Sequence, residues 1–450
     1  MIKRKVTKKI ETWYKNNDSS LLIDGARQIG KTTAIRMFLN DNNIDYVEIN
    51  LLENKLALEA FNTSCDTEQL LIRLTSLANK NLNKHETVFF IDEIQEADDA
   101  ITVIKFLSQD KSYRYIFSGS LLGIKMKNIK SIPVGFLEII DMHPLDFEEF
   151  IKALSVSDKT ISILKEAYQN ETKVDDIMHR QMMNLFNLYL VVGGMPKAVQ
   201  IFIDTKDINR VNIALKDIDD GYILDISKYD SEEKLLIQDI YDLIPSELNA
   251  QNKRFILKNL NEKARFYQYE TSFTWLKNSG VGLFVHNVDN PVYPLLASKE
   301  RTLFKLFLCD VGLLSYKLFN GKQIVLLNGN TNVNYGALYE AVAAQELEAH
   351  NYSLYYNSDK KRGEIDFLIE ENDKIVPIEV KSGKDYKRHS ALNQLLNNKE
   401  FNIEKAIVLC NGNLHKENKR LYLPIYMIMF MNNEIYDKTS IVDIDISKLI

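Results

Sequence analysis

The chain has 450 residues, of which 45% are hydrophobic and 26% are charged, and its formal net charge at pH 7 is −6. These values exclude extended disorder and a uniformly basic coat for nucleic acid, while they allow a local basic site. No run approaches the roughly 18 apolar residues that a membrane span needs, and the N-terminus has no apolar signal core. The cysteines, Cys65, Cys309 and Cys410, have no metal-binding or redox spacing. The sequence therefore predicts a cytoplasmic protein of about three domains that does not contact a membrane.

A strand, a glycine-containing loop and a helix follow one another near the N-terminus. Residues 3–16 have the spacing of an amphipathic helix, residues 21–23 are typical of a buried strand, and residues 33–39 indicate a helix. Between strand and helix, Gly25 to Thr32 has the full Walker A spacing, in which glycines aim backbone N–H groups at phosphates. Lys31 is expected to reach the β- and γ-phosphates, and the Thr32 hydroxyl to bind Mg²⁺. The predicted nucleotide-binding residues are Gly25, Ala26, Arg27, Gln28, Ile29, Gly30, Lys31, Thr32 and Thr33.

An apolar run that ends in two acids predicts the partner of this loop. Residues 45–50 indicate a strand and residues 68–82 a helix, and residues 87–91 then form an apolar strand that closes on Asp92 and Glu93. Open α/β sheets bind their ligands at the carboxyl ends of the strands. This segment therefore fits a Walker B motif, in which Asp92 holds Mg²⁺ and Glu93 orients and helps to deprotonate the attacking water.

A further strand, residues 113–117, ends in Ser118-Gly119-Ser120. A polar side chain at the tip of this strand could sense the γ-phosphate or the attacking water, whereas the same residues would also suit a simple turn. Ser118 and Ser120 both qualify, and the sequence does not choose between them. With Lys31 and Glu93, they complete the predicted catalytic set.

The order of these motifs resembles the prokaryotic predicted AAA-domain ATPases that carry a C-terminal domain of uncharacterised function. The likeness continues through His143 to Phe150, Tyr189 to Pro196, Phe307 to Leu313 and Gly336 to Glu340, so it covers nearly the whole chain. The resemblance implies ATP binding and hydrolysis, with residues 1–153 as the ATPase domain and residues 154–246 as its helical lid. Gly193-Gly194-Met195-Pro196 is typical of a helix stop within that lid.

One position departs from the family pattern. Many members have Gly-Arg where this chain has Gly135-Phe136. If that arginine acts on the nucleotide of a neighbouring subunit, another arginine, such as Arg114, would have to replace it. Because an arginine finger is worth roughly 10³ to 10⁵ in rate, its loss would leave a slow ATPase or a nucleotide-gated switch.

Residues 247–300 suggest a winged-helix module. The pattern predicts helices over residues 253–261 and 270–279, followed by a short hairpin near Asn290-Pro291. The second helix would be the recognition element if the module binds DNA. A purely structural or protein-binding module explains the same charges.

The last predicted domain, residues 301–450, contains a second group of polar residues. Residues 363–369 and 375–381 predict a strand hairpin that carries Asp366 on one strand and Glu379 with Lys381 on the same face of the other. This hairpin resembles the core of the PD-(D/E)xK nucleases. The resemblance implies that Asp366, Glu379 and Glu340 bind Mg²⁺ or Mn²⁺ and that Lys381 polarises water. A surface hairpin with ordinary ion pairs is the alternative, and residues 406–410 and 423–428 predict further strands.

Together these features predict an α/β protein, with a P-loop AAA-type domain, a helical lid, a winged-helix module and a nuclease-like C-terminal domain. The predicted function is ATP hydrolysis, with Mg²⁺, that switches or drives a DNA-binding or nuclease-like module. One alternative is a nucleotide-regulated protein-interaction switch with a silent C-terminal domain. The other is a metal-dependent nuclease licensed by ATP. DNA, a second copy of the chain or a protein partner all stay open as binding partners.

Overall fold

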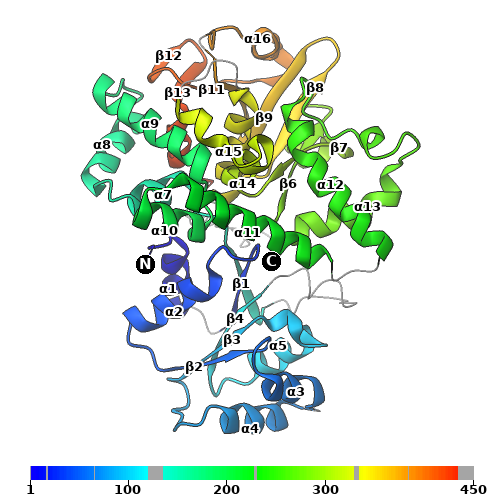
Figure 1. Cartoon of the computed structure of the whole chain (residues 1–450). Coiled ribbons are helices and arrows are strands. Elements are labelled where there is room, and N and C mark those ends of the chain that lie inside the picture. The colour runs from blue at the N-terminus through cyan, green and yellow to red at the C-terminus, as the bar shows by residue number, and fades with distance from the viewer. Residues whose placement is uncertain are drawn as a thin grey trace, which may run out of the picture.

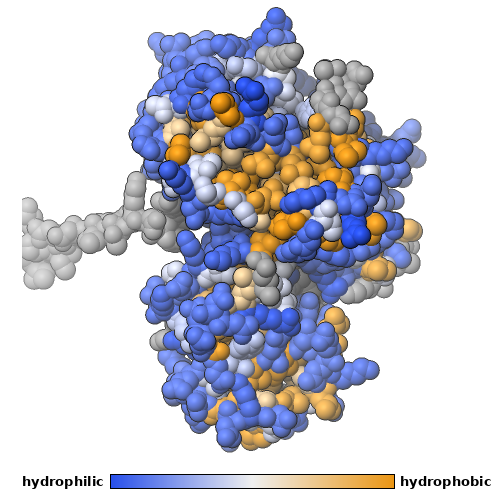
Figure 2. Space-filling view, turned by 60° about the vertical axis from the view of Figure 1, so that its left-hand side comes forward, coloured by the Kyte–Doolittle hydropathy of each residue, from blue (hydrophilic) through white to orange (hydrophobic). Residues whose placement is uncertain are grey.

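The computed structural model describes residues 2–16, 19–64, 66–119, 135–227, 231–328, 334–383 and 385–433. Within these residues the chain is a mixed α/β protein with two sheets, which confirms the predicted fold class. One sheet has five strands and the other has eight. Figure 1 shows the smaller sheet with its helices in the lower part and the larger sheet in the upper part, with a layer of helices at their junction. In Figure 2 hydrophobic residues gather on one face of the upper part, whereas the lower part is mostly hydrophilic from this side.

The lower sheet is parallel and has the strand order β2-β3-β4-β1-β5. Its strands β1 and β3 are buried along their whole length, as expected for parallel strands with helices on both faces. Helices α1 and α2 share a core with one face, and α3, α4 and α5 share a core with the other. The bounds are α1 Val6–Asn16, β1 Ser20–Asp24, α2 Lys31–Asp41, β2 Tyr46–Asn50, α3 Lys55–Thr63, α4 Thr67–Leu77, β3 Val88–Asp92, 3-10 helix η1 Ile94–Glu96, α5 Ala100–Gln109, β4 Arg114–Ser118 and β5 Leu137–Asp141.

The strand order brings the predicted motifs to one edge. Because β4 lies between β1 and β3, the carboxyl end of β4 lies between the loop after β1 and the acids after β3. Strand β5, which borders the other side of β1, was not predicted from the sequence. The helix predicted over residues 68–82 ends already at Leu77.

The helical layer follows the lower sheet, in agreement with the pattern of its sequence. It comprises α7 Phe147–Ala153, α8 Asp158–Gln169, α9 Asp176–Val192, α10 Pro196–Thr205, α11 Ile208–Ile226 and α12 Ser231–Asn249. Helix α9 ends at the predicted stop, where Gly193 has a φ of 73°. Among the described residues no single helix has the length and apolarity to cross a membrane; α9 and α10 would meet both criteria together, but they are bent by 119°.

The upper sheet is mixed and has the order β12-β13-β11-β10-β9-β8-β6-β7. The predicted hairpin is present, since β9 and β10 pair antiparallel with Phe367 opposite Ile378. The strand predicted over residues 423–428 is wrong from Ile425 onward, because β13 ends at Pro424 and a 3-10 helix follows. The bounds are η2 Leu257–Asn259, α13 Phe266–Asn278, β6 Gly282–Val288, η3 Leu295–Ser298, β7 Lys299–Leu308, α14 Val311–Phe319, η4 Gln323–Asn328, α15 Tyr335–Ala349, β8 Tyr355–Asp359, β9 Gly363–Glu371, β10 Lys374–Lys381, α16 Ser390–Asn397, η5 Lys399–Phe401, β11 Ala406–Cys410, β12 His415–Glu417, β13 Arg420–Pro424 and η6 Ile425–Phe430.

The winged-helix interpretation of residues 247–300 is not confirmed. The helix predicted over residues 253–261 is absent, and only the single turn η2 forms there. Tertiary contacts override the local pattern, because the Phe255 N–H donates to the Phe304 carbonyl at 2.9 Å and the Phe255 ring contacts those of Phe273 and Phe304. Strands β6 and β7 also belong to the upper sheet, through the parallel pairing of β6 with β8.

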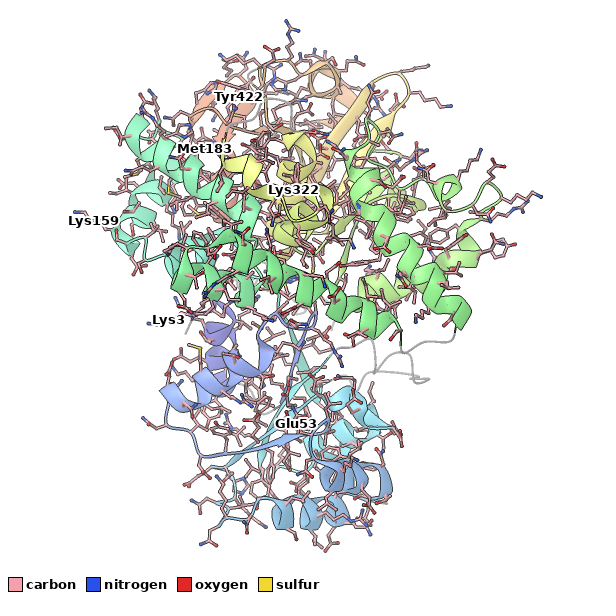
Figure 3. All side chains as sticks on the ribbon, in the orientation of Figure 1. Lys3, Glu53, Lys159, Met183, Lys322 and Tyr422 are labelled. Atoms are coloured by element: carbon pink, nitrogen blue, oxygen red, sulfur yellow. The ribbon has the colours of Figure 1, made fainter. Side chains whose placement is uncertain are left out.

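A buried junction joins the lower sheet, the helical layer and the upper part. The Leu145 N–H donates to the Gly194 carbonyl at 2.7 Å, and the Gly194 N–H donates to the Asp310 carboxylate at 2.5 Å. Asp310 also caps α14 by accepting from the Leu313 N–H at 3.0 Å, and its burial raises the pKa of its carboxyl to about 6. Figure 3 shows the side chains of the lower sheet, the helical layer and the upper part on the same ribbon.

The close approach at Gly194 leads to a stability prediction. A Cβ atom at this position would lie 2.1 Å from the Leu145 carbonyl oxygen, so we expect Gly194→Ala to destabilise the protein by about 1–3 kcal/mol, as overpacked sites do. Thermal unfolding of the full chain measures the effect. Gly383→Ala is the control, since a Cβ there meets no atom within 4 Å. Equal melting temperatures for the two variants would contradict this account of the junction.

Candidate functional site

The predicted phosphate-binding loop forms between β1 and α2. Gly25, Gln28 and Gly30 have φ values of 141°, 64° and 90°, so the loop turns through conformations that favour glycine. A Cβ at Gly25 would lie 2.2 Å from the Met142 carbonyl oxygen beyond β5. Gly30 is the N-cap of α2 and provides no side-chain cap, so the first N–H groups of the helix are left for an anion.

Lys31 is folded into this loop. Its ammonium donates to the carbonyl oxygens of Gly25 and Ala26, both at 2.9 Å. Burial lowers the pKa of Lys31, while the nearby carboxylates of Glu93, Asp24 and Asp92 act in the opposite direction. The loop thus holds one buried positive charge beside the N-terminus of a helix, an arrangement that suits phosphate.

Four neutral donors hydrogen-bond the Asp92 carboxylate at the end of β3, one of them the Glu93 backbone N–H at 3.2 Å from Oδ1. The Thr32 hydroxyl donates to Asp92 Oδ2 at 3.0 Å, the Asn50 amide donates to the same oxygen at 3.1 Å, and the Ser118 hydroxyl donates to Oδ1. The structure therefore brings together the two residues predicted to bind Mg²⁺, and this hydroxyl and carboxylate donor set fits such a hard cation. The prediction missed Asn50, although its position as a polar residue closing strand β2 could have indicated it. Thr33 is exposed on α2.

Glu93 occupies the turn directly after Asp92. Its backbone is in the left-handed region with a φ of 57°, and its carboxylate accepts from the Gln95 side-chain amide. The prediction did not include Gln95. The sequence did not choose between Ser118 and Ser120 as the catalytic serine. The Ser118 hydroxyl donates to Asp92, and Ser120 lies outside the described residues.

The loop also contacts the helical layer and the upper part. The Arg27 guanidinium lies 2.5 Å from the Asp225 carboxylate of α11, and the Tyr222 hydroxyl donates to the Arg27 carbonyl at 3.2 Å. On the other side, a Cβ at Gly280 would lie 2.9 Å from the Ala26 nitrogen. Helix α11 crosses above the lower sheet in Figure 1. The loop therefore contacts the helical layer at α11 and the upper part at Gly280.

Arg114 does not face this loop. It lies at the amino end of β4, whereas Ser118 lies at the carboxyl end. Its guanidinium donates to the Tyr14 carbonyl and stacks 4.5 Å from the centre of the Tyr14 ring. A role for Arg114 as an arginine finger stays a prediction. Phe136 has 37% of its surface exposed.

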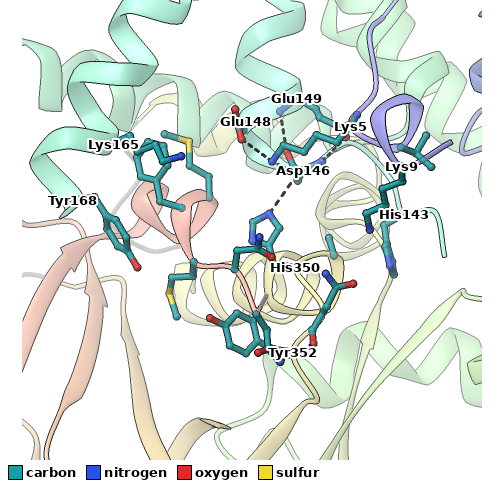
Figure 4. Close-up of a pocket in the computed structure, with 18 of the residues that line it drawn as sticks. Lys5, Lys9, His143, Asp146, Glu148, Glu149, Lys165, Tyr168, His350 and Tyr352 are labelled. Atoms are coloured by element: carbon teal, nitrogen blue, oxygen red, sulfur yellow. Dashed lines mark hydrogen bonds and ion pairs between the residues drawn. The ribbon is translucent and has the colours of Figure 1, made fainter. Parts of the chain in front are cut away.

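A cavity of about 780 Å³ lies between α1, α8 and the end of α15, apart from the loop. Figure 4 shows Lys5 beside Asp146 and Glu148, with His350 pointing at Asp146. The Lys5 ammonium lies 2.7 Å from both carboxylates, and His350 Nε2 lies 3.4 Å from Asp146. His143 also lines the cavity, and burial together with the positive charge of Lys9 lowers its pKa to about 4. These paired charges lie where the lower sheet, the helical layer and the upper part meet.

The four residues predicted for the nuclease-like site do lie together. Asp366 Oδ2 accepts from the Val380 N–H at 2.8 Å, the Lys381 ammonium lies 2.7 Å from Glu379, and Glu340 on α15 contacts Lys253 and Lys305. Burial and the neighbouring Glu340 and Glu379 raise the pKa of Asp366 to about 8. Nevertheless, among the described residues no three His, Cys, Asp or Glu side chains are arranged to hold a metal ion. The expected second Mg²⁺ or Mn²⁺ is therefore not supported.

Comparison with family models identifies the lower part. Residues 17–151 match the model of an AAA domain. Residues 183–323 and 335–428 match two domains of unknown function, DUF8612 and DUF4143. The first match, with the parallel sheet and its loop, confirms an AAA-type P-loop domain. The predicted domain limits and the nuclease-fold resemblance stay predictions.

Three solved structures illustrate more distant likeness. The Walker-type ATPase Paby2304 of Pyrococcus abyssi is 14% identical with a TM-score of 0.43, and the match covers 70% of this chain and 96% of that one. For the RuvB Holliday junction branch migration motor of Thermotoga maritima the values are 14%, 0.28, 63% and 90%. For Pif1 of a Bacteroides species they are 13%, 0.22, 37% and 50%. None of these TM-scores reaches 0.5, so none defines a common fold for the whole chain. A search of curated proteins finds no match.

The contact between the loop and α11 predicts an effect on nucleotide exchange. Because a partly exposed ion pair is worth up to about 1 kcal/mol, we expect Asp225→Asn to speed the release of a fluorescent ADP analogue by up to roughly fivefold. Stopped-flow fluorescence measures the rate. Asp217→Asn is the matched control, since Asp217 also lies on α11 but forms an exposed pair with Lys197 of α10. Equal release rates for both variants would show that α11 does not restrain the loop.

Proposed function

We propose that this chain is an ATPase that binds ATP with Mg²⁺ in the loop from Gly25 to Thr33, hydrolyses it slowly, and transmits the nucleotide state to α11. The observation that carries the proposal is the 3.0 Å contact between the Thr32 hydroxyl and the Asp92 carboxylate, at the carboxyl edge of a parallel sheet. In P-loop enzymes these two groups hold Mg²⁺. The match to an AAA domain supports the same role. Such a protein would use the ATP of the cytoplasm, the location that the sequence predicts.

Each residue of the loop edge has a role in this proposal. The Lys31 ammonium exchanges the Gly25 and Ala26 carbonyl oxygens for phosphate oxygens and offsets their charge. Thr32 and Asp92 would hold Mg²⁺, which neutralises charge on the phosphates when it is bound. Glu93, steadied by the Gln95 amide, orients a water molecule and accepts its proton.

The contacts of Arg27 support a link between the nucleotide and the rest of the chain. Phosphate binding draws Lys31 away from the carbonyl oxygens of Gly25 and Ala26. The next residue, Arg27, binds Asp225 and Tyr222 on α11. A change in the loop therefore alters the position of α11 relative to the lower sheet. Phe136 stands where the family that the sequence resembles often has arginine, so a second copy or a protein partner would have to supply a finger for fast turnover.

Two substitutions separate binding from turnover. Lys31→Ala removes a charge-assisted bond to phosphate, so we expect ATP affinity, measured by calorimetry, to fall roughly tenfold to a hundredfold. Glu93→Gln removes the proton acceptor, so we expect phosphate release to fall roughly 10² to 10⁴-fold while ATP still binds. Lys55→Ala, at an exposed lysine of α3, should change neither quantity.

Wild-type affinity in Lys31→Ala would remove the proposed site. Wild-type phosphate release in Glu93→Gln would assign the water to another residue, with the binding site left intact.

DNA is our proposed partner for the upper part. Lys360, Lys361 and Arg388 are exposed before β9 and after β10, where they add local positive charge to an acidic chain. The alternatives are a protein-interaction switch with a silent C-terminal domain and a nuclease licensed by ATP. A nuclease would also need a divalent cation at the acidic cluster of the upper part.

Turnover in the presence of DNA distinguishes these alternatives. We expect single-stranded, duplex or branched DNA to raise the rate of phosphate release, and the effect to decline steeply with salt, because phosphate contacts release counterions. Lys360→Glu combined with Lys361→Glu should abolish the stimulation. A rate that no DNA changes would favour the protein-interaction switch.

A further inference from the structure

One lysine lies at the centre of the acidic cluster of the upper part. Lys305 projects from β7 and its side chain has 0% of its surface exposed. Its ammonium lies 2.6 Å from Glu364, 3.3 Å from Glu340 and 3.9 Å from Asp366, and 5.2 Å from the centre of the Tyr356 ring. A single buried ammonium thus contacts carboxylates from helix α15 and strand β9.

The cluster is nearly neutral without any added ion. Four carboxylates face three ammonium groups. Lys253 pairs with Glu340, and Lys381 pairs with Glu379 at 2.7 Å. Lys305 contacts Glu364 and Asp366, and it also contacts Glu340. Buried charges are tolerated when they are paired in this way. One carboxylate oxygen, Glu379 Oε2, has no hydrogen-bond partner. A divalent cation bound to this oxygen would lie close to the Lys381 ammonium, which pairs with the other oxygen of the same carboxylate.

We propose that Lys305 occupies the place where a nuclease-like centre would hold its divalent cation, so that this cluster is a metal-free structural core. The residues present do not fit the metal that the resemblance implies, because Lys305 and Lys381 already pair with Glu340 and Glu379. Lys305 also lies 3.9 Å from Asp366, and these ammonium groups repel a second positive charge. The cluster then serves to join α15, β7 and β9. The chain therefore lacks metal-dependent nuclease activity at this centre, whether or not its P-loop hydrolyses ATP.

Manganese binding to the full-length protein tests the proposal. Electron paramagnetic resonance of free Mn²⁺, without nucleotide, gives the number of ions bound per chain. We expect wild type and Asp366→Asn to bind equally, since any ion at Asp92 is common to both. A Mn²⁺ ion that binds wild type and is lost in Asp366→Asn would overturn the proposal, and this comparison requires no change at Lys305.

Removing the ammonium should create the site that it now fills. We expect Lys305→Met to gain one Mn²⁺ per chain, bound at least tenfold more tightly than by wild type, and to melt at a higher temperature when Mn²⁺ is added. Lys305→Arg keeps the charge and should gain none. Lys317→Met is the matched control, since Lys317 pairs with Asp219 and Asp242 away from the cluster. A folded Lys305→Met protein that gains no Mn²⁺ would also overturn the proposal.

Discussion

The chain depends on the buried hydrogen bonds of Gly194, because they fix where α10 and α11 begin relative to the loop. The Gly194 carbonyl binds the Leu145 N–H, in the segment that continues from β5, and the Gly194 N–H binds Asp310 at the start of α14. Strand β5 in turn borders Gly25 through the Met142 carbonyl. A short path of backbone contacts therefore runs from the loop through β5 to the first turn of α10. Since α11 follows α10, the same path sets the distance between Arg27 and Asp225.

Only glycine fits at this crossing. A Cβ at Gly193 would lie 2.3 Å from the Asp310 carboxylate, and one at Gly194 would lie 2.1 Å from the Leu145 carbonyl. Three of the segments that carry the family resemblance outside the loop meet here, namely residues 143–150, 189–196 and 307–313. Their likeness thus has a packing reason, because they hold the AAA domain, the helical layer and the upper part together.

The sequence predicted what local pattern controls. Apolar strands β1 and β3, the turn at Gly25 and Gly30, and the hairpin that carries Asp366 and Glu379 all follow from residues close together in the chain. Strand β5 escaped prediction because it lies at an edge and alternates less clearly. The helix predicted over residues 253–261 is absent because Phe255 pairs with a strand about 50 residues later. Lys305 was missed for the same reason, since only the mixed sheet brings β7 beside Glu340 and Asp366.

The two acidic sites differ in the charge of their partners, and this difference determines where a divalent cation can bind. Around Asp92 the donors are a threonine hydroxyl, a serine hydroxyl, an asparagine amide and the Glu93 backbone N–H, all of them neutral. A cation can replace these neutral hydrogen bonds without displacing an ammonium group that is bonded to the carboxylate. Around Glu340 and Asp366 the partners are buried ammonium groups that neutralise the carboxylates directly. In our proposals, similar acidic residues thus suit opposite tasks: the lower sheet would accept Mg²⁺ with a nucleotide, while the acids of the upper sheet are paired with lysine.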